Sequence, residues 1–277
     1  KRRWEELKQK LDTKEALARK LAEAEAQKIR WSGVGREAGD VEELEIASKV
    51  KVRFHWCPPG RFTMGSNDGE SDEKPPHPVQ LSKGFWMAET ECTQGQWEAV
   101  MGTRPSHFAN NENGWKKYPV ESVSWDEVQR FLDKVKANGM VPEGMEIVLP
   151  TEAQWEYACR AETDGAYAGD LNKMAWYSDN ADGTTHPVGL KQANAWGLKD
   201  MHGNVWEWCA DRFDDDYYAD SPRVDPKGPT KGVPRVLRGG CWDDLAHFCR
   251  SAFRFRLTPS TRFNNSGFRF ALQAAGG

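Results

Sequence analysis

The chain of 277 residues contains no run of eighteen apolar residues, so we expect no transmembrane helix. None of its six cysteines belongs to a Cys-x-x-Cys pair, which argues against a zinc site. The six histidines show no His-x-x-x-His spacing, which argues against an iron centre built from two histidines and a carboxylate. With a net charge of −4, the chain also lacks the basic excess that is typical of nucleic-acid-binding proteins.

A more local absence marks the C-terminal part of the chain. The segment 239–269 contains no Lys, Glu, Gln or Met, although these residues are frequent elsewhere in the sequence. Within it, Phe253, Phe255 and Leu257 alternate with Arg254 and Arg256, and this period of two predicts a β-strand. One interpretation buries the aromatic face and exposes the arginines to water. The other holds the arginines in the scaffold and turns the apolar side chains outward toward a ligand.

The N-terminal part of the chain differs in composition from the rest. Residues 1–31 are rich in Lys, Glu, Ala and Leu and contain neither Gly nor Pro, which predicts a helical extension. We expect residues 32–51 to form a linker into a single domain that spans residues 52–277. Inside that domain, Ser124 with Glu127 and Thr151 with Gln154 form capping-box patterns, which predict helices over 125–138 and 152–160.

Several long motifs follow one another in a recognisable order. They are CPPG at 57–60, FTMGS at 62–66, ECTQ at 91–94, VSW at 123–125, LPTEAQWEY at 149–157, GLKDMHGNVWEW at 197–208, RGG at 238–240 and GFR at 267–269. In these motifs the chain resembles the formylglycine-generating-enzyme branch of the C-type lectin fold, over about four fifths of its length. The resemblance implies an α+β, loop-rich fold, with two main helices beside a mostly antiparallel sheet.

The enzymes of this family use a reactive cysteine pair after the Gly-Gly element, and such a pair can bind copper or attack as a thiolate. Here Cys249 falls on the second cysteine of that pattern, but Asp244 falls on the first, and Cys241 lies three residues too early. A carboxylate cannot replace a thiolate in disulfide chemistry or toward a soft metal. We therefore expect neither formylglycine generation nor a redox cofactor.

The sequence pattern of the C-terminal segment is also similar to that of the variable proteins of diversity-generating retroelements, including the Treponema type. The genes of these proteins are rewritten at adenines. In that group the resemblance implies a variable region, here about 239–269, in which Lys, Glu, Gln, Met and Trp cannot arise from the usual asparagine codons. The one Trp of this segment, Trp242, falls on a scaffold position. The candidate variable, ligand-binding positions are Cys241, Asp243, Asp244, Leu245, His247, Phe248, Phe253, Phe255, Leu257, Thr258, Ser260, Thr261, Phe263, Asn264 and Asn265. We expect Asp243, Asp244 and the phenylalanines at 248, 253, 255 and 263 to share one exposed face.

The resulting hypothesis is a receptor- or adhesin-like protein that displays a hypervariable binding surface. Rigid aromatic side chains lose little entropy on binding, so the predicted surface suits recognition of a protein or other surface ligand. We expect a monomer at the cell surface or outside the cell, and a lipoprotein whose anchor segment is missing from this chain would fit that location. The alternatives are an oxidoreductase of the formylglycine-generating type with an altered active site, and a structural or assembly module.

One metal site is implied by the resemblance. The family holds calcium in the segment that corresponds to 197–208, and the matching oxygen donors here are the Asp200 and Glu207 carboxylates and the Gly203 and Val205 carbonyls. A structural Ca²⁺ ion is thus one expectation, and a loop held by hydrogen bonds alone is the other. The acidic residues Asp211 and 214–216 are expected to form a solvated loop.

Overall fold

The computed structural model of the chain describes residues 5, 9, 12–19, 33–108 and 114–276. Of the predicted N-terminal extension, the described residues 5, 9 and 12–19 are helical and exposed, and the remainder of that prediction lies outside the described residues. No helix in the described part of the chain is both long enough and apolar enough to cross a membrane.

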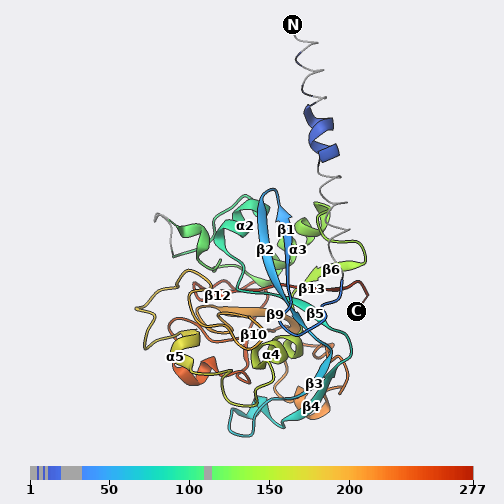
Figure 1. Cartoon of the computed structure of the whole chain (residues 1–277). Coiled ribbons are helices and arrows are strands. Elements are labelled where there is room, and N and C mark those ends of the chain that lie inside the picture. Colours follow the sequence, from blue (N-terminus) through green and yellow to red (C-terminus); the bar gives the residue numbers. More distant parts are fainter. Residues whose placement is uncertain (1–4, 6–8, 10–11, 20–32, 109–113, 277) are drawn as a thin grey trace.

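Two sheets form the centre of the domain (Figure 1). The larger sheet is antiparallel throughout and has the order β1 (Val41–Ala47), β2 (Val50–Cys57), β5 (Phe85–Ala88), β13 (Ala271–Ala274) and β6 (Met145–Val148). The first strand lies within residues 32–51, so the sheet begins before the domain boundary expected at residue 52. The chain thus enters the fold at one sheet edge and leaves it near the other.

The second sheet carries the C-terminal segment. Its order is β11 (Phe255–Leu257), β10 (Arg235–Arg238), β9 (Trp206–Arg212) and β12 (Ser266–Gly267), with β12 parallel to β9. Two small ribbons complete the strands: β3 (Gly60–Met64) with β4 (His77–Leu81), and β7 (Ala175–Trp176) with β8 (His202–Gly203). Most pairings are antiparallel, as predicted.

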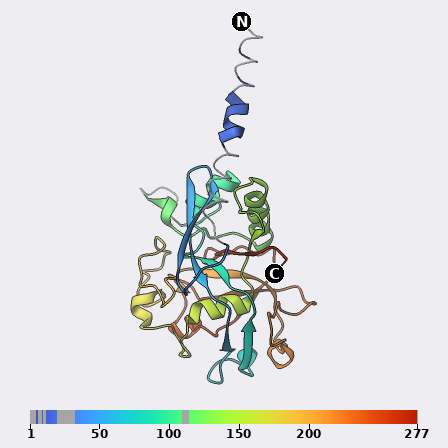
Figure 2. The ribbon, with the colours of Figure 1, turned by 45° about the vertical axis from the view of Figure 1, so that its right-hand side comes forward.

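The helices are short, and long irregular segments connect them to the strands (Figure 2). They are α2 (Gln94–Met101), α3 (Trp125–Ala137), α4 (Glu152–Arg160), α5 (Leu171–Met174) and α6 (Tyr217–Asp220), with single 3-10 turns η1 (Ser71–Glu73), η2 (Trp115–Lys117) and η3 (Ala246–Cys249). The predicted capping boxes are confirmed: the hydroxyl of Ser124 accepts from the Glu127 amide, and that of Thr151 accepts from the Gln154 amide. Because each box closes within four residues, these two helix starts were readable from the sequence.

Aromatic side chains fill the space between the elements. Trp97 of α2 stacks on Phe131 of α3 with ring centroids 5.4 Å apart, and Phe268 meets both rings edge-on. A second cluster gathers around Trp155 of α4, beneath the second sheet. Burying such large rings supplies much of the apolar stabilisation of a loop-rich domain. Part of the C-terminal segment that follows β10 packs into these buried clusters.

Candidate ligand-binding surface

Four arginines fasten the C-terminal segment to the domain. Each forms an ion pair with a buried glutamate: Arg238 with Glu156, Arg250 with Glu73, Arg254 with Glu152, and Arg269 with Glu207. Three of these pairs are bidentate; in one, the Arg254 guanidinium donates to the two Glu152 oxygens at 2.7 and 3.0 Å. Paired, charge-assisted hydrogen bonds of this kind fix geometry strongly. Burial alone lowers the pKa of Arg254, but the Glu152 carboxylate raises it above its ordinary value.

Trp206, the first residue of β9, contacts several of the positions predicted to form the surface. Its ring centroid lies 5.9 Å from that of Phe253 and 5.1 Å from that of Phe255. Its side chain lies near the Asp244 carboxylate, and its backbone amide donates to the Asn265 carbonyl at 2.7 Å. Residues from three separate stretches of the C-terminal segment therefore meet around one buried ring.

Further contacts extend this cluster. Phe248 meets Phe253 edge-on at 5.0 Å and lies 3.9 Å from the His247 ring, while the Asn265 amide donates to Asp243 at 3.4 Å. We call the exposed and half-buried members of this set the Trp206 face: Asp243, Asp244, His247, Phe248, Phe255 and Asn265. Four of the six residues expected to share one surface, Asp243, Asp244, Phe248 and Phe255, lie on it.

The predicted positions differ in exposure. Asp243, Leu245, His247, Phe255, Thr258, Ser260 and Phe263 are exposed; Asp244, Phe248, Leu257, Thr261, Asn264 and Asn265 are half-buried; Cys241 and Phe253 are buried. The last two are corrections, because neither side chain can meet a ligand as the structure stands. Cys241 is fully buried, and Phe253 retains only 7% exposure.

The period-two interpretation of 253–257 is wrong for its first half. Strand β11 begins only at Phe255, so Phe253 and Arg254 lie in irregular backbone, and both are buried. Arg254 is held by the scaffold, as one interpretation proposed, whereas Arg256 is exposed and pairs with the exposed Asp215 at 2.8 Å. The ion pair of Arg254 with a distant helix decides this arrangement, and strand periodicity does not predict such a contact.

The loop 258–265 lies beside the helix α3. The Phe263 carbonyl accepts from the Ser122 amide at 2.9 Å, and the Pro259 carbonyl accepts from the Asp126 amide at 3.2 Å. The guanidinium of Arg262 pairs with Glu127 at 2.7 Å. The backbone of this loop is thereby fixed, while the Phe263 side chain keeps 49% exposure. A fixed backbone with exposed side chains suits substitution without loss of the fold.

The cysteines show no activated thiol. All six are buried and free, including Cys241 and Cys249. Burial raises the pKa of both thiols, and the Asp244 carboxylate raises each further. A neutral, buried thiol is a poor nucleophile. The Cys249 position therefore lacks the features of a catalytic thiolate in this structure.

The predicted calcium loop forms a compact buried cluster. The Asp200 Oδ2 atom accepts from the Gly189 amide at 2.6 Å, whereas its Oδ1 atom is buried without a partner. Both carboxylate oxygens of Glu91 are also buried and unpartnered, and Glu207 is occupied by Arg269 and by the Trp155 indole at 2.7 Å. Burial raises the pKa of Asp200 to about 6. Three carboxylates around one arginine leave an uncompensated charge, so these residues fit a bound cation.

Neither Trp206 nor Glu91 was predicted from the sequence to belong to a site, and Asp211 was predicted to lie in a solvated loop. Alternation along β9 puts Trp206 and Trp208 on one face and Glu207 on the other, a signal that was present in the WEW triplet. Asp211 is buried instead of solvated, and its Oδ2 atom accepts from the Glu152 amide at 2.8 Å. No sequence-local pattern indicates that contact, because the two residues lie far apart in the chain.

The fold and this surface define a protein of the C-type lectin-like, formylglycine-generating-enzyme type. The model of the sulfatase-modifying factor enzyme 1-like domain matches residues 44–274, and the chain belongs to that family. The solved structure of Treponema denticola variable protein 1 superposes with a TM-score of 0.77 and 31% identity, covering 83% of this chain and 98% of that one.

Two curated relatives show how widely the domain is used. The formylglycine-generating enzyme of Streptomyces coelicolor is 36% identical over 201 residues, which are 64% of this chain and 61% of the enzyme. The serine/threonine-protein kinase pkn1 of Chlamydia caviae is 32% identical over 268 residues, 88% of this chain and 41% of the kinase. The chain thus spans about two fifths of the kinase and about three fifths of the enzyme.

Proposed function

We propose that this chain is a ligand-binding protein whose C-terminal surface, built from the Trp206 face and the loop 258–265, is diversified by a retroelement. The observation that carries the proposal is the division of the segment into arginines fixed by buried glutamates and side chains that remain exposed between them. The likeness to a variable protein over most of its length supports the same function. The partner would be a protein or another surface ligand.

A library experiment tests the binding surface. Leu245, Ser260 and Phe263 are randomised together on the displayed full chain, and an equally sized control library randomises the β1 and β2 positions Val41, Glu43 and Lys51, which are exposed. Selection against a panel of unrelated folded proteins should enrich binders from the first library and not from the control. Equal enrichment from both libraries, or from neither, would contradict the assignment of the binding surface.

The retroelement is tested in the source DNA. The gene segment that encodes residues 239–269 should have a near-repeat close by that differs from it at adenines only, beside a reverse-transcriptase gene. Natural copies of the gene should then vary at the exposed positions and keep Arg250, Arg254 and Arg269. A source genome without such a repeat would contradict diversification by a retroelement, and the proposal would then be limited to a binding surface of fixed sequence.

The second candidate function is oxidation of a cysteine-containing peptide of the sulfatase type. It is favoured by the identity to a formylglycine-generating enzyme and by Cys249. The buried neutral thiol and the carboxylate of Asp244 at the first cysteine position speak against it. Copper-dependent turnover of such a peptide that disappears in Cys249→Ser would place this function first.

We further propose a structural Ca²⁺ ion held by Asp200 and Glu207, with the carbonyls of Gly203 and Val205 and the nearby Glu91. The unpartnered oxygens of Asp200 and Glu91 support it. Calcium at a hundred times its dissociation constant would stabilise the fold by about 2.7 kcal/mol, so the melting temperature should rise by several degrees over that in a chelator. Asp200→Asn should reduce the rise, whereas the exposed control Asp179→Asn should keep it. An unchanged melting temperature in wild type would refute the ion.

The monomeric state and the cell-surface or extracellular location stay proposals. Sedimentation of the full chain would test the first, and fractionation of the source cells would test the second. A surface-displayed binding protein should be accessible to protease on intact cells.

A further inference from the structure

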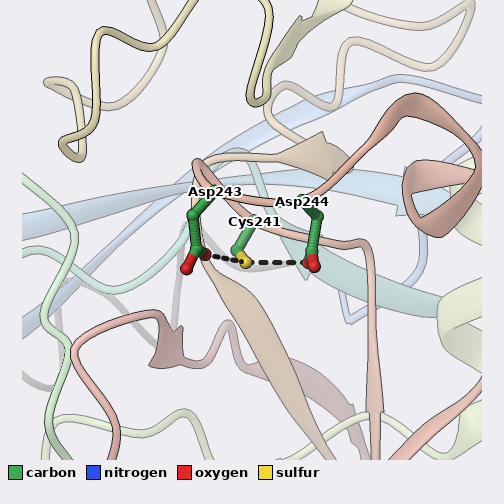
Figure 3. Close-up of side chains that lie close together, drawn as sticks. All are labelled: Cys241, Asp243 and Asp244. Carbon is green, nitrogen blue, oxygen red and sulfur yellow. Dashed lines mark hydrogen bonds between the residues drawn. The ribbon is translucent and has the colours of Figure 1, made fainter.

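One thiol sulfur and two carboxylate oxygens lie close together at the Trp206 face. The Cys241 sulfur lies 2.9 Å from an Asp243 carboxylate oxygen and 2.8 Å from an Asp244 oxygen, between the two side chains (Figure 3). One donor atom from each residue lies within 4.8 Å of the other two. The sulfur is buried, Asp244 is half-buried and Asp243 is exposed, so the cluster is closed by protein on one side and open on the other.

A thiol alone does not satisfy this geometry. It carries one proton, so it can donate to one carboxylate, and the second carboxylate then faces a sulfur lone pair at less than 3 Å. Two carboxylate groups and one buried sulfur therefore form a close cluster of three electron-rich donor atoms.

In the described part of the chain, no basic side chain balances the negative charges of Asp243 and Asp244. Within residues 33–108 and 114–276, neither Asp243 nor Asp244 forms an ion pair with an arginine, lysine or histidine. The contrast with Glu73, Glu152 and Glu207 is sharp, because each of these buried carboxylates faces an arginine within hydrogen-bonding distance. An unpaired anionic cluster at the protein surface is satisfied by a cation from solution.

We propose that Cys241, Asp243 and Asp244 bind a divalent cation of the zinc class through one thiolate and two carboxylate oxygens. The sulfur selects a borderline-soft ion over calcium or magnesium, which prefer oxygen donors alone. Three protein ligands leave the fourth tetrahedral position to water, as in open zinc sites. The thiol proton is released to solvent when the metal–sulfur bond forms, so binding strengthens as the pH rises.

The size of the cluster suits such an ion. Zinc–sulfur bonds of about 2.3 Å and zinc–oxygen bonds of about 2.1 Å place the donor atoms roughly 3.5 Å apart around a tetrahedral ion. The present sulfur–oxygen separations are shorter, so the two aspartate side chains need only rotate outward slightly, and the exposed Asp243 has room to do so. The donors differ from those of the family's cysteine pair, because two carboxylates take part and Cys249 does not.

The position of the ion gives it a role at the surface. Asp243 and Asp244 belong to the Trp206 face, so the metal would lie directly on that face. Its open position would then accept a histidine or carboxylate from a bound target. This consequence depends on the proposed ligand-binding function, whereas the metal site itself does not.

The experiment measures metal binding by the full chain without any target. Chelator-treated protein is titrated with Zn²⁺ in competition with a chromophoric chelator, and with Co²⁺ to detect a thiolate-to-cobalt charge-transfer band in the near ultraviolet. We expect one equivalent of metal and a cobalt–thiolate band. Cys241→Ser should abolish the band and weaken zinc binding about a hundredfold, and Asp243→Asn should weaken it about tenfold or more.

The controls separate this site from its neighbours. Cys249→Ser and the exposed Asp179→Asn should bind zinc as wild type does, and Asp200→Asn should affect calcium only. Thermal melts show whether each variant is folded, and Asp243→Asn remains informative if Cys241→Ser unfolds, because its side chain is exposed. The proposal is overturned if folded wild type binds no stoichiometric zinc, if Asp243→Asn binds unchanged, or if Cys249→Ser loses the metal as fully as Cys241→Ser.

Discussion

Two arginines separated by one residue show how the C-terminal segment is divided. Arg254 is buried and donates two hydrogen bonds to Glu152, whereas Arg256 is exposed and pairs with an exposed aspartate. The two phenylalanines that precede them differ in the same way, since Phe253 is 7% exposed and Phe255 is 38% exposed. The segment therefore consists of two interleaved sets of side chains, one that is buried in the fold and one that is exposed to solvent.

The largest test of this comparison removes each arginine in turn. Arg254→Ala should lower the free energy of unfolding by about 3 kcal/mol or more, because it leaves the Glu152 carboxylate buried with a lost partner. Arg256→Ala, the matched control, should cost less than about 1 kcal/mol, because exposed ion pairs contribute little. Urea unfolding measures both. Equal losses would show that the two positions do not belong to different sets.

The phenylalanines provide the second test. Phe253→Ala should destabilise the protein by about 3 kcal/mol, as expected for a large ring removed from a core. Phe255→Ala should cost about 1 kcal/mol or less, and Phe255→Ser combined with Phe263→Ser should leave a cooperative melt. Adding Phe253→Ser to that pair should lower the melting temperature by many degrees. If the triple variant melts like the double one, Phe253 is not part of the core.

The third test concerns the buried Asp211 beneath this segment. Burial, and then the Glu152 carboxylate, raise its pKa from 3.8 to about 8. The folded state thus favours the protonated form, so this contribution to stability is complete below about pH 4 and is lost as the pH rises through 8. Asp211→Asn should gain stability relative to wild type over that range, on the order of 2 kcal/mol at pH 8.

The exposed Asp216→Asn is the control for that measurement. Its stability relative to wild type should not change between pH 4 and pH 8. A flat difference for Asp211→Asn as well would mean that Asp211 is ionised in the folded protein.

The smallest expected effect concerns the exposed set of side chains. Leu245→Asn and Ser260→Tyr replace exposed side chains, so together they should shift the melting temperature by no more than about two degrees. Differential scanning fluorimetry measures the shift. A larger loss would place these side chains in contacts that the structure assigns to solvent.

Much of the fold was readable from the sequence, but the site was readable only in part. The residues around Ser124 and Thr151 predicted two helix starts, and the ordered motifs predicted the family and its α+β fold. All the named surface positions except Cys241 and Phe253 are exposed or half-buried, and their role in binding stays a prediction. The burial of Cys241 and Phe253, and the central position of Trp206, were not predicted.

The segment proposed to bind calcium and the proposed zinc-class site show the same limit. The resemblance named Asp200 and Glu207, but it did not indicate that Glu91 lies near Asp200 with both oxygens unpartnered. The absence of a Cys-x-x-Cys pair argued against zinc, yet that pattern describes only sites with two neighbouring thiols. A single cysteine between two aspartates carries no comparable sequence signal.

The sequence by itself determined what depends on neighbouring residues: helix caps, strand alternation in β9, and the absence of long charged side chains from 239–269 except arginine. Tertiary structure decided which side chains of that segment are fixed and which are exposed. The physical reason is that each decision rests on a partner far along the chain. Arg254 is buried with its partner Glu152, and Arg256 is exposed with its partner Asp215.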